Sequence, residues 1–194
     1  FFPNGNVPNL ESYATAEAAG DDRALFNGVN RSLDNDDVST FKSGFGVAKF
    51  TNFKTDGSAG HDATFPDADF FLMRAAEAYL NFAEADAHIN GGETTAEGTE
   101  AINAIRKRAN ASTREDKGYS LSDICDEWSR EFYFEGRRRM DLIRFNRYGG
   151  NVNYNWQWKG GTKEGRNFSK DLNIFAIPTN ELTSNKNLIQ NPGY

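Results

Sequence analysis

The stretch from residue 120 to residue 147 restricts the fold of this chain more than any other, because it opens with a helix signal and carries both an apolar and a charged row. Ser120 and Asp123 have the spacing of a capping box, in which the serine side chain accepts from a backbone N–H and the acid bonds back to the cap. A helix is therefore predicted to begin here. Apolar side chains then recur every four residues and predict one buried face: Ile124, Trp128 and Phe132.

Acidic side chains form a second row next to this stripe, and they need cationic partners. Arginines downstream have the four-residue spacing that pairs charges on a helix, as for Glu135 with Arg139 and Arg137 with Asp141. An exposed pair of this kind adds only about 0.2–0.5 kcal/mol, so surface pairing does not explain so many arginines. A guanidinium can bind a carboxylate and several carbonyls at once, which predicts a staple between helices rather than a solvated face. The acidic row consists of Glu127, Glu131 and Glu135.

A glycine interrupts this charged stretch at position 136. Glycine inside a helix costs about 1 kcal/mol relative to alanine, so Gly136 predicts a kink or a break between two helices. The density of charge implies that each group is committed to a neighbour. We therefore expect a structural network that braces the last helices against an earlier helical hairpin, formed by Glu131, Glu135, Arg138, Asp141 and Arg144.

Charge and cysteine content exclude several classes of function. The 194 residues carry a net charge of −6, which argues against a nucleic-acid partner because phosphate binding needs a basic surface. The single cysteine, Cys125, excludes an internal disulfide and a cysteine-based zinc site, and its place beside the apolar stripe predicts a buried thiol. The acidic run from Asp34 to Asp37 lacks the glycine of a calcium loop, so turn chemistry explains it better. We expect no metal and no cofactor, and no run approaches the ~20 apolar residues of a membrane span.

The chain divides into three segments within one domain. Residues 1–66 are rich in Asn, Gly, Asp and Phe and predict an ordered, loop-rich segment whose best strand candidate is Phe45–Phe53. Residues 67–148 predict a helical hairpin region, and residues 149–194 a loop and C-terminal segment packed on the helices. Because the sequence begins at Phe1 without a methionine, we expect a fragment of a longer chain.

Two helices are predicted ahead of residue 120. The first is capped by Asp67 or Asp69 and ends at Asn90-Gly91-Gly92, and a capping box at Thr94 and Glu97 starts the second. Helices joined by short polar turns predict an all-α fold of stacked helical hairpins, with long irregular loops and little strand. The large, small, small, aromatic spacing of the first helix is typical of a tetratricopeptide repeat. Its apolar face comprises Leu72, Ala75, Ala76, Tyr79, Phe82 and Ala83, and that of the second helix Ala101, Ile102, Ile105 and Ala109.

Residues 149–171 return to a loop that is rich in Gly and Asn and holds two tryptophans two positions apart. In an extended segment both rings would face the same side. Such rings can stack on the apolar faces of sugars while Asn or Gln bonds the hydroxyls, or they can pack the loop onto the helices. Both alternatives stay open. The candidate ligand-binding residues are Tyr154, Asn155, Trp156 and Trp158. A short extended segment, Leu172–Ile177, is expected before Pro178.

Four stretches carry recognisable motifs in a fixed order. They are Phe71–Ala85, Ile102–Ala109, Arg130–Arg144 and Ile177–Tyr194. In order and spacing they resemble the C-terminal half of the SusD/RagB-type outer-membrane glycan-binding lipoproteins of the Bacteroidetes. Residues 1–66 resemble that family more loosely, through Asp22-Arg23 and the segment around Lys49.

The resemblance implies an all-α, tetratricopeptide-like fold whose long loops present an oligosaccharide site at the extracellular face of the outer membrane. It also implies a partner, the SusC-type TonB-dependent transporter, to which bound oligosaccharides are delivered for uptake. Family members are longer and carry a lipid anchor at the N-terminus, so we expect this chain to be a fragment without that anchor and membrane attachment to occur only through it. Part of the ligand site is expected in the missing part.

A protein-interaction scaffold without direct sugar binding is the alternative, because helical hairpins bind partners through a concave face. An enzyme is not expected: Glu131 and Glu135 could pose as a glycosidase pair, but neighbouring guanidiniums favour the ionised form of both and remove the general acid. No catalytic residue is assigned.

Overall fold

The computed structural model describes residues 20–150 and 154–194, and the prediction for residues 1–19 lies outside them. The described chain is mostly helical with one two-stranded sheet, which confirms the predicted all-α class. It forms two compact units, which divide between Arg138 and Arg139. The α-helices are α3 (Ala75–Ile89), α4 (Ala96–Arg108), α5 (Leu121–Phe132), α6 (Arg138–Arg144) and α7 (Thr179–Ser184).

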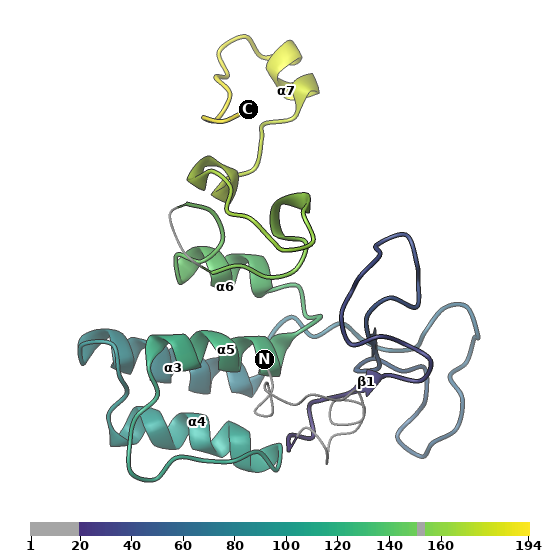
Figure 1. Cartoon of the computed structure of the whole chain (residues 1–194), viewed down its shortest axis with the longest axis vertical. Helices are drawn as coiled ribbons and strands as arrows, with labels where there is room; N and C mark the ends of the chain where they lie inside the picture. Colours follow the sequence, from purple (N-terminus) through teal and green to yellow (C-terminus); the bar gives the residue numbers. More distant parts are fainter. Residues whose placement is uncertain (1–19, 151–153) are drawn as a thin grey trace. The chain divides into compact units, whose positions relative to one another are not determined.

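Helices α3, α4 and α5 build the core of the first unit. Helix α3 packs against both α4 and α5 (Figure 1). Trp128 of α5 is fully buried and donates from its indole nitrogen to the Glu84 carboxylate of α3 at 2.8 Å, so the large ring is buried without losing a hydrogen bond. The apolar core residues of the three helices are Leu80, Ala83, Ala87, Ala101, Ile102, Ile105, Ile124, Trp128 and Phe132.

The first predicted helix begins later than expected. Its N-cap is Arg74, with extended backbone angles, so neither Asp67 nor Asp69 caps it and Leu72 lies outside it with 87% of its surface exposed. The end at Ile89, followed by Asn90, agrees with the prediction. The predicted apolar face is also rotated, since Tyr79 and Phe82 are 46% and 52% exposed. Small side chains let α3 lie between two helices, and its buried residues are Leu80, Ala83, Glu84 and Ala87.

The second predicted helix keeps its face but loses its capping box. Its N-cap is Thr95, whose side chain donates to Asp86 of α3, while the Thr94 hydroxyl is buried against Thr99 and accepts from the Tyr119 backbone N–H. The box at Thr94 and Glu97 was therefore wrong, because tertiary partners take both hydroxyls. The predicted face of Ala101, Ile102, Ile105 and Ala109 is buried.

Helix α5 agrees with the sequence analysis in its start, its buried stripe and its end. Ser120 accepts from the Asp123 backbone N–H at 3.2 Å, and the Asp123 carboxylate accepts from the Ser120 backbone N–H at 2.9 Å, which is the predicted capping box. The helix ends at Phe132, and Gly136 follows with a φ of +76°, a left-handed angle that glycine adopts without strain. The predicted break between two helices is confirmed.

Within residues 20–74, the described segment ahead of α3, the strands form one short sheet. Strand β1 (Phe26–Asn27) pairs antiparallel with β2 (Gly46–Val47), with Phe26 opposite Val47. The strand predicted over Phe45–Phe53 is thus much shorter, because the Lys49 side chain leaves the sheet to bond the end of α5 and Phe53 instead forms an isolated bridge with Ala59.

The second unit is held together largely by side chains that bond the backbone. The 3₁₀ helices η1 (Lys159–Gly161) and η2 (Lys170–Asn173) precede an extended stretch. The extended segment predicted from Leu172 therefore starts only after η2, whose N-cap Ser169 accepts from the Asp171 backbone N–H. Beyond α7, the Gln190 side chain accepts from the Ile177 backbone N–H at 2.8 Å and donates to its carbonyl at 3.0 Å.

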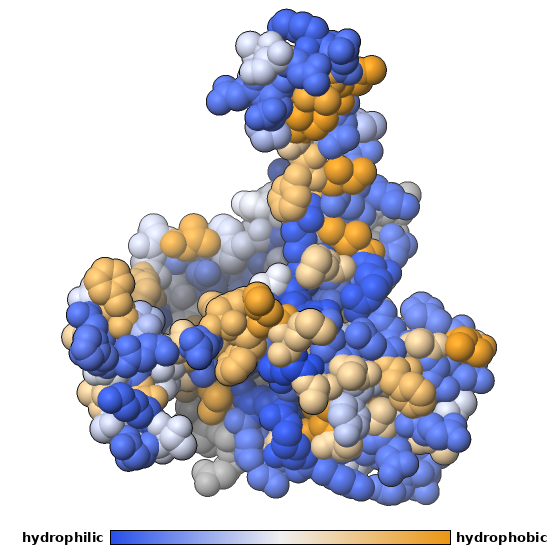
Figure 2. Space-filling view, turned by 180° about the vertical axis from the view of Figure 1, so that it is seen from behind, coloured by the Kyte–Doolittle hydropathy of each residue, from blue (hydrophilic) through white to orange (hydrophobic). Residues whose placement is uncertain are grey.

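Apolar side chains also reach the surface. Figure 2 shows them set among hydrophilic residues on the face that it presents. Four consecutive large apolar residues ahead of α3 are more than half exposed: Phe70, Phe71, Leu72 and Met73. Within the described residues, no helix is long and apolar enough to cross a membrane.

The capping box of α5 provides a test of the fold. Ser120→Ala removes the acceptor for the Asp123 N–H, and we expect the free energy of unfolding to fall by about 1 kcal/mol. Urea unfolding followed by far-UV circular dichroism measures it. Ser122→Ala is the matched control, because Ser122 is exposed on the same helix turn. An equal effect of the two substitutions would contradict the capping role.

Candidate functional site

Glu131 is the centre of a buried charge cluster at the end of α5. Its side chain is 1% exposed, and three arginines from three separate segments bond its carboxylate. Arg74 donates from Nη1 at 2.6 Å, Arg108 from Nη2 at 2.7 Å and Arg23 from Nη1 at 3.0 Å. Because each donor is charged, these are strong hydrogen bonds in a site with little water.

Arg74 joins Glu131 to Glu135. Its Nε and Nη2 donate to the two carboxylate oxygens of Glu135, both at 2.8 Å, and Nη2 also donates to the Glu131 carbonyl at 2.7 Å. Its guanidinium lies 4.1 Å from the centre of the Phe132 ring. From the segment after β2, Lys49 Nζ donates to Glu135 and to the carbonyls of Glu131 and Tyr133. Both cations therefore also satisfy carbonyls that the end of α5 leaves without helical partners.

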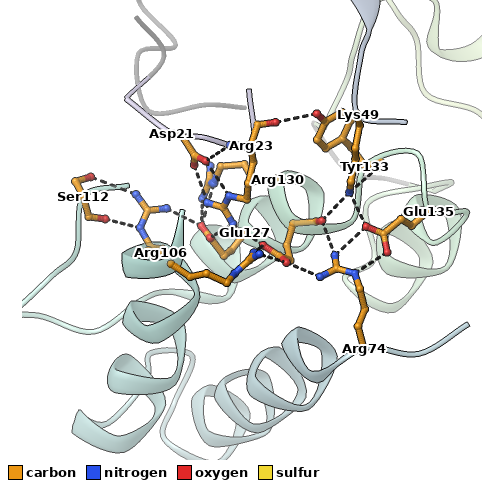
Figure 3. Close-up of polar contacts among 12 residues, drawn as sticks. Asp21, Arg23, Lys49, Arg74, Arg106, Ser112, Glu127, Arg130, Tyr133 and Glu135 are labelled. Carbon is orange, nitrogen blue, oxygen red and sulfur yellow. Dashed lines mark hydrogen bonds and ion pairs between the residues drawn. The ribbon is translucent and has the colours of Figure 1, made fainter. Parts of the chain in front are cut away.

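Glu127 extends the cluster one turn back along α5. It accepts from Arg23 at 2.8 Å, from Arg106 at 2.6 Å and from Arg130 at 2.8 Å. Arg23 also bonds Asp21 through Nε and Nη2, so this loop residue ties the segment before β1 to α5. Figure 3 shows the side chains of these separate segments converging on the α5 carboxylates.

The cations set the protonation of these acids. Burial alone would raise the pKa of Glu127, but Arg130, Arg23 and Arg106 outweigh it and lower the pKa to about 2. Burial likewise opposes ionisation of Glu135, and the bonds from Arg74 and Lys49 lower its pKa below the ordinary value. Burial lowers the pKa of Lys49, although its bond with Glu135 works in the other direction.

The predicted partners of the acidic row were wrong. Arg137 bonds Glu77 of α3 at 2.7 Å, and Arg139 donates to the carbonyls of Leu172 and Asn173. The reason is the break at Gly136, because residues 133–137 are not helical and the four-residue spacing no longer places side chains on one face. The partners of Glu131 and Glu135 come from upstream segments instead.

The remaining members of the predicted network lie further along the chain. Arg138 donates to the Cys125 carbonyl at 2.9 Å, and the Cys125 side chain is buried, as predicted. Asp141 is 1% exposed and pairs with Arg144 three residues later at 3.1 Å. That these residues act with Glu131 and Glu135 as one brace stays a prediction.

A pocket of about 380 Å³ opens onto this cluster. Charged groups line part of it, including Lys49, Arg74 and Arg108. Apolar side chains form the rest of the wall, notably Phe50 and Phe71. The described residues contain no group of three or more side chains of His, Cys, Asp or Glu that could hold a metal ion. In the acidic run, Asp37 accepts from Ser39 and Thr40 in a turn.

The predicted ligand-binding loop forms an aromatic cluster in the second unit. Trp156 stacks on Tyr148, with ring centres 6.5 Å apart and planes at 26°, and meets Tyr154 edge to face at 6.3 Å. Trp156 remains 37% exposed and Asn155 is exposed. Part of the Trp156 ring therefore packs the loop, while another part faces solvent.

Trp156 and Trp158 do not alternate along an extended strand. Trp158 has a φ of +65°, and the Lys159 backbone N–H donates to the Trp156 carbonyl at 3.1 Å, so the chain turns between them. The condition under which both rings would face the same side is not met. Trp158 is half-buried, whereas Tyr154 lies against the Arg147 guanidinium at 4.7 Å.

Lys159 organises this cluster and was not singled out from the sequence. It is 1% exposed, and its Nζ donates to the Tyr154 carbonyl at 2.6 Å and to Asn167 Oδ1 at 2.9 Å. Nζ also lies 4.8 Å from the centre of the Trp156 ring, a cation–π distance. Burial lowers the pKa of Lys159. A lysine in a Gly-rich loop gives no sequence signal for burial.

The upstream cations of the first cluster did leave a signal. Arg74, Arg106 and Arg108 stand in the quoted helix motifs, and Arg23 and Lys49 are the two positions at which residues 1–66 resembled the SusD/RagB pattern. What the sequence did not indicate was that they bond the acids of the row along α5, since partners separated by 21 to 108 positions have no spacing rule.

Comparison with known proteins identifies the class. The profile of the SusD family (SusD/RagB) matches residues 10–194, so the chain belongs to the SusD family. It is 43% identical over 182 residues to the starch-binding protein SusD of Bacteroides thetaiotaomicron, a match that covers 92% of this chain. The match covers 32% of that protein, so the chain spans about a third of its relative's length.

Solved structures agree on the fold. Surface glycan-binding protein A from Bacteroides uniformis superposes with a TM-score of 0.58 at 24% identity, over 89% of this chain and 38% of that one. A laminarin-binding SusD-like protein gives 0.57 at 23% identity, over 97% and 38%. A SusD superfamily protein from Parabacteroides distasonis gives 0.57 at 19% identity, over 95% and 41%. These likenesses concern the fold alone.

The lowered pKa of Glu127 predicts a pH dependence of stability. Its folded pKa of about 2 lies below the ordinary 4.5, so ionised Glu127 contributes stability above pH 4.5 that is lost as the pH falls through 2. The difference corresponds to about 3 kcal/mol. Glu127→Gln should lower the free energy of unfolding near pH 6 and flatten its decline below pH 4.5, as urea unfolding at a series of pH values measures. Glu100→Gln, on the exposed side of α4, should leave both unchanged. An unchanged slope in Glu127→Gln would refute this assignment.

Lys159 predicts a second stability effect, confined to the second unit. Lys159→Met keeps most of the volume but leaves the Tyr154 carbonyl and Asn167 without their donor, which should cost about 1–3 kcal/mol. Near-UV circular dichroism should also change, because Trp156 loses its cationic neighbour. Lys186→Met is the control, since Lys186 is exposed. If both variants unfold at the same temperature, Lys159 does not hold the loop.

Proposed function

We propose that this protein binds extracellular oligosaccharides without transforming them, and that its ligands are α-linked glucans of the starch type. One observation carries the proposal: 43% identity, over 92% of this chain, to a protein named for starch binding. Family membership over residues 10–194 supports the same class of function.

The aromatic loop of the second unit is the part of the chain that we propose contacts the sugar. Trp156 is held on one side by Tyr148 and Lys159 and is still 37% exposed. A ring fixed in this way loses little freedom when a sugar packs against its exposed part. The exposed amide of Asn155 lies next to it in the chain and can bond a hydroxyl. Tyr154 and Trp158 complete the proposed platform.

The charge cluster supports a non-catalytic role. Glycoside hydrolysis needs one carboxyl group that stays protonated near neutral pH. Here the pKa values of Glu127 and Glu135 are lowered instead, and Arg74 bonds Glu131 as well as Glu135. The cluster is therefore suited to holding segments together and is poorly suited to general acid catalysis.

We further propose that the protein acts at the extracellular face of the outer membrane and delivers oligosaccharides to a SusC-type TonB-dependent transporter. The support is family membership. Co-purification tests it: detergent-solubilised transporter should be retained by the tagged protein. Absence of a complex in a strain that expresses both would count against delivery while leaving sugar binding untouched.

Isothermal titration with maltoheptaose tests the proposed function. We expect saturable binding, no release of reducing ends, and no comparable binding of a β-linked glucan of equal length. Trp156→Ala should weaken binding at least about tenfold, equivalent to about 1.4 kcal/mol. Trp158→Ala measures the contribution of the half-buried ring.

Glu135→Ala is the matched control for this experiment. It removes a partner of Arg74 and Lys49, so it should lower the melting temperature while the folded fraction keeps its affinity for maltoheptaose. Affinity that falls with Glu135→Ala but survives Trp156→Ala would place the sugar elsewhere. Tight binding of a peptide, with no glycan bound, would replace the proposal with an interaction scaffold.

A further inference from the structure

One cation of the charge-lined pocket in the first unit has hydrogen-bond donors that the ion pairs of the cluster do not use. Arg108, in the last turn of α4, donates only from Nη2, which contacts both Glu131 carboxylate oxygens at 2.7 Å. Among the described residues, its Nε and Nη1 have no hydrogen-bond partner. The Arg108 side chain is 60% exposed, although it lines the pocket. Three N–H donors of one guanidinium therefore stay available to a ligand.

The other cations of the pocket are more fully committed. Lys49 places its three donors on Glu135 and on two carbonyls. Arg74 uses Nε, Nη1 and Nη2 on Glu131 and Glu135, and Arg23 uses its three nitrogens on Asp21, Glu127 and Glu131. Arg108 is thus the lining cation with the most unused donors.

The charges that line the pocket do not cancel. Its lining cations are Arg23, Lys49, Arg74 and Arg108, and its lining carboxylates are Asp22, Glu131 and Glu135. One positive charge is left over, and it remains when the bonded neighbours are added, because the acids Asp21 and Glu127 are matched by Arg106 and Arg130. A ligand with a single negative charge would balance the pocket, whereas a neutral sugar would leave the surplus in place.

The rest of the wall is apolar. Leu25, Phe50 and Phe71 line the pocket with 41%, 39% and 56% of their surfaces exposed, and Tyr133 adds a further ring. Apolar surface of this kind gains free energy when a ligand removes it from water. The volume of about 380 Å³ lies in the range of pockets that bind small molecules.

We propose that this pocket binds a small organic monocarboxylate with an apolar or aromatic body. The carboxylate accepts from Nη1 of Arg108, and the body packs against Phe50 and Phe71. Arg108 suits this role because Glu131 bonds its Nη2 and leaves Nη1 to donate a charge-assisted hydrogen bond. This pocket and the proposed sugar platform at Trp156 are made of different residues. An experiment that refutes one proposal therefore leaves the other untouched.

A carboxylate could reach the pocket as a free aromatic acid or as part of an acidic sugar. Three probes distinguish these sources in titrations of the full chain: 3-phenylpropionate, methyl glucuronide and acetate. The apolar wall favours 3-phenylpropionate, which should bind more tightly than methyl glucuronide by at least about fivefold and more tightly than acetate by at least about tenfold. The neutral analogue 3-phenylpropanamide should bind at least about tenfold more weakly than its acid.

Variants locate the binding. Arg108→Gln should abolish the heat of binding of 3-phenylpropionate, and Arg108→Lys, which keeps a positive charge on a single nitrogen that must also bond Glu131, should weaken it at least about fivefold. Lys107→Gln removes an equal charge from the neighbouring, exposed position outside this pocket and should leave it unchanged. Phe71→Ala tests the apolar wall at a half-exposed residue, with an expected loss of about fivefold.

Far-UV circular dichroism on each variant confirms that the chain is folded, and Arg108→Lys and Phe71→Ala stay informative if Arg108→Gln unfolds. Equal binding of the acid and the amide, or unchanged binding in Arg108→Lys, would overturn the proposal. Preferred binding of methyl glucuronide would retain the carboxylate and replace the aromatic body with an acidic sugar. No binding of any probe would show that Arg108 serves only Glu131.

Discussion

Arg74 stands at the residue before α3 and bonds Glu131 and Glu135 at the far end of α5, 57 and 61 positions along the chain. The other segments of the first unit meet at the same carboxylates: Arg108 closes α4, Arg23 ties the segment before β1, and Lys49 reaches in beyond β2. A buried carboxylate that loses one of these cations keeps fewer charge-assisted hydrogen bonds, and the segment that supplied the cation loses its tie to α5. Local helix propensity contributes much less.

This arrangement separates two tasks that the charged stretch of the sequence seemed to combine. Glu127 and Glu131 of α5 are buried and bonded by cations from other segments, so they fix loops that have almost no strand pairing of their own. The exposed ring and amide proposed to contact the sugar lie around Trp156 in the second unit. There the buried Lys159 lies against the Trp156 ring and holds the loop. In both units a cation bonded to backbone carbonyls holds loop segments together, as strand pairing does in folds that are rich in sheet.

How far the sequence predicted this structure depended on how local each signal was. The capping box at Ser120, the stripe from Ile124 to Phe132 and the break at Gly136 are set by neighbours in sequence, and all three were predicted correctly. The cap at Thr94 and the start of α3 were wrong, because contacts with Tyr119 and the α5 carboxylates outweigh local preference. Lys159 could not have been found, since its burial depends on carbonyls and rings brought together by loop geometry.

Gln190 has a consequence for how this chain can vary. Its side-chain amide bonds both the N–H and the carbonyl of Ile177, as the backbone of a neighbouring strand would, and Asn191 adds a bond to the Phe175 carbonyl. The pairing depends on the number of residues between Ile177 and Gln190, while most side chains between them are exposed. Substitutions in this interval should therefore change stability little, but insertion or deletion of one residue would move the Gln190 amide out of register with Ile177. Length, more than composition, is what this terminal segment has to conserve.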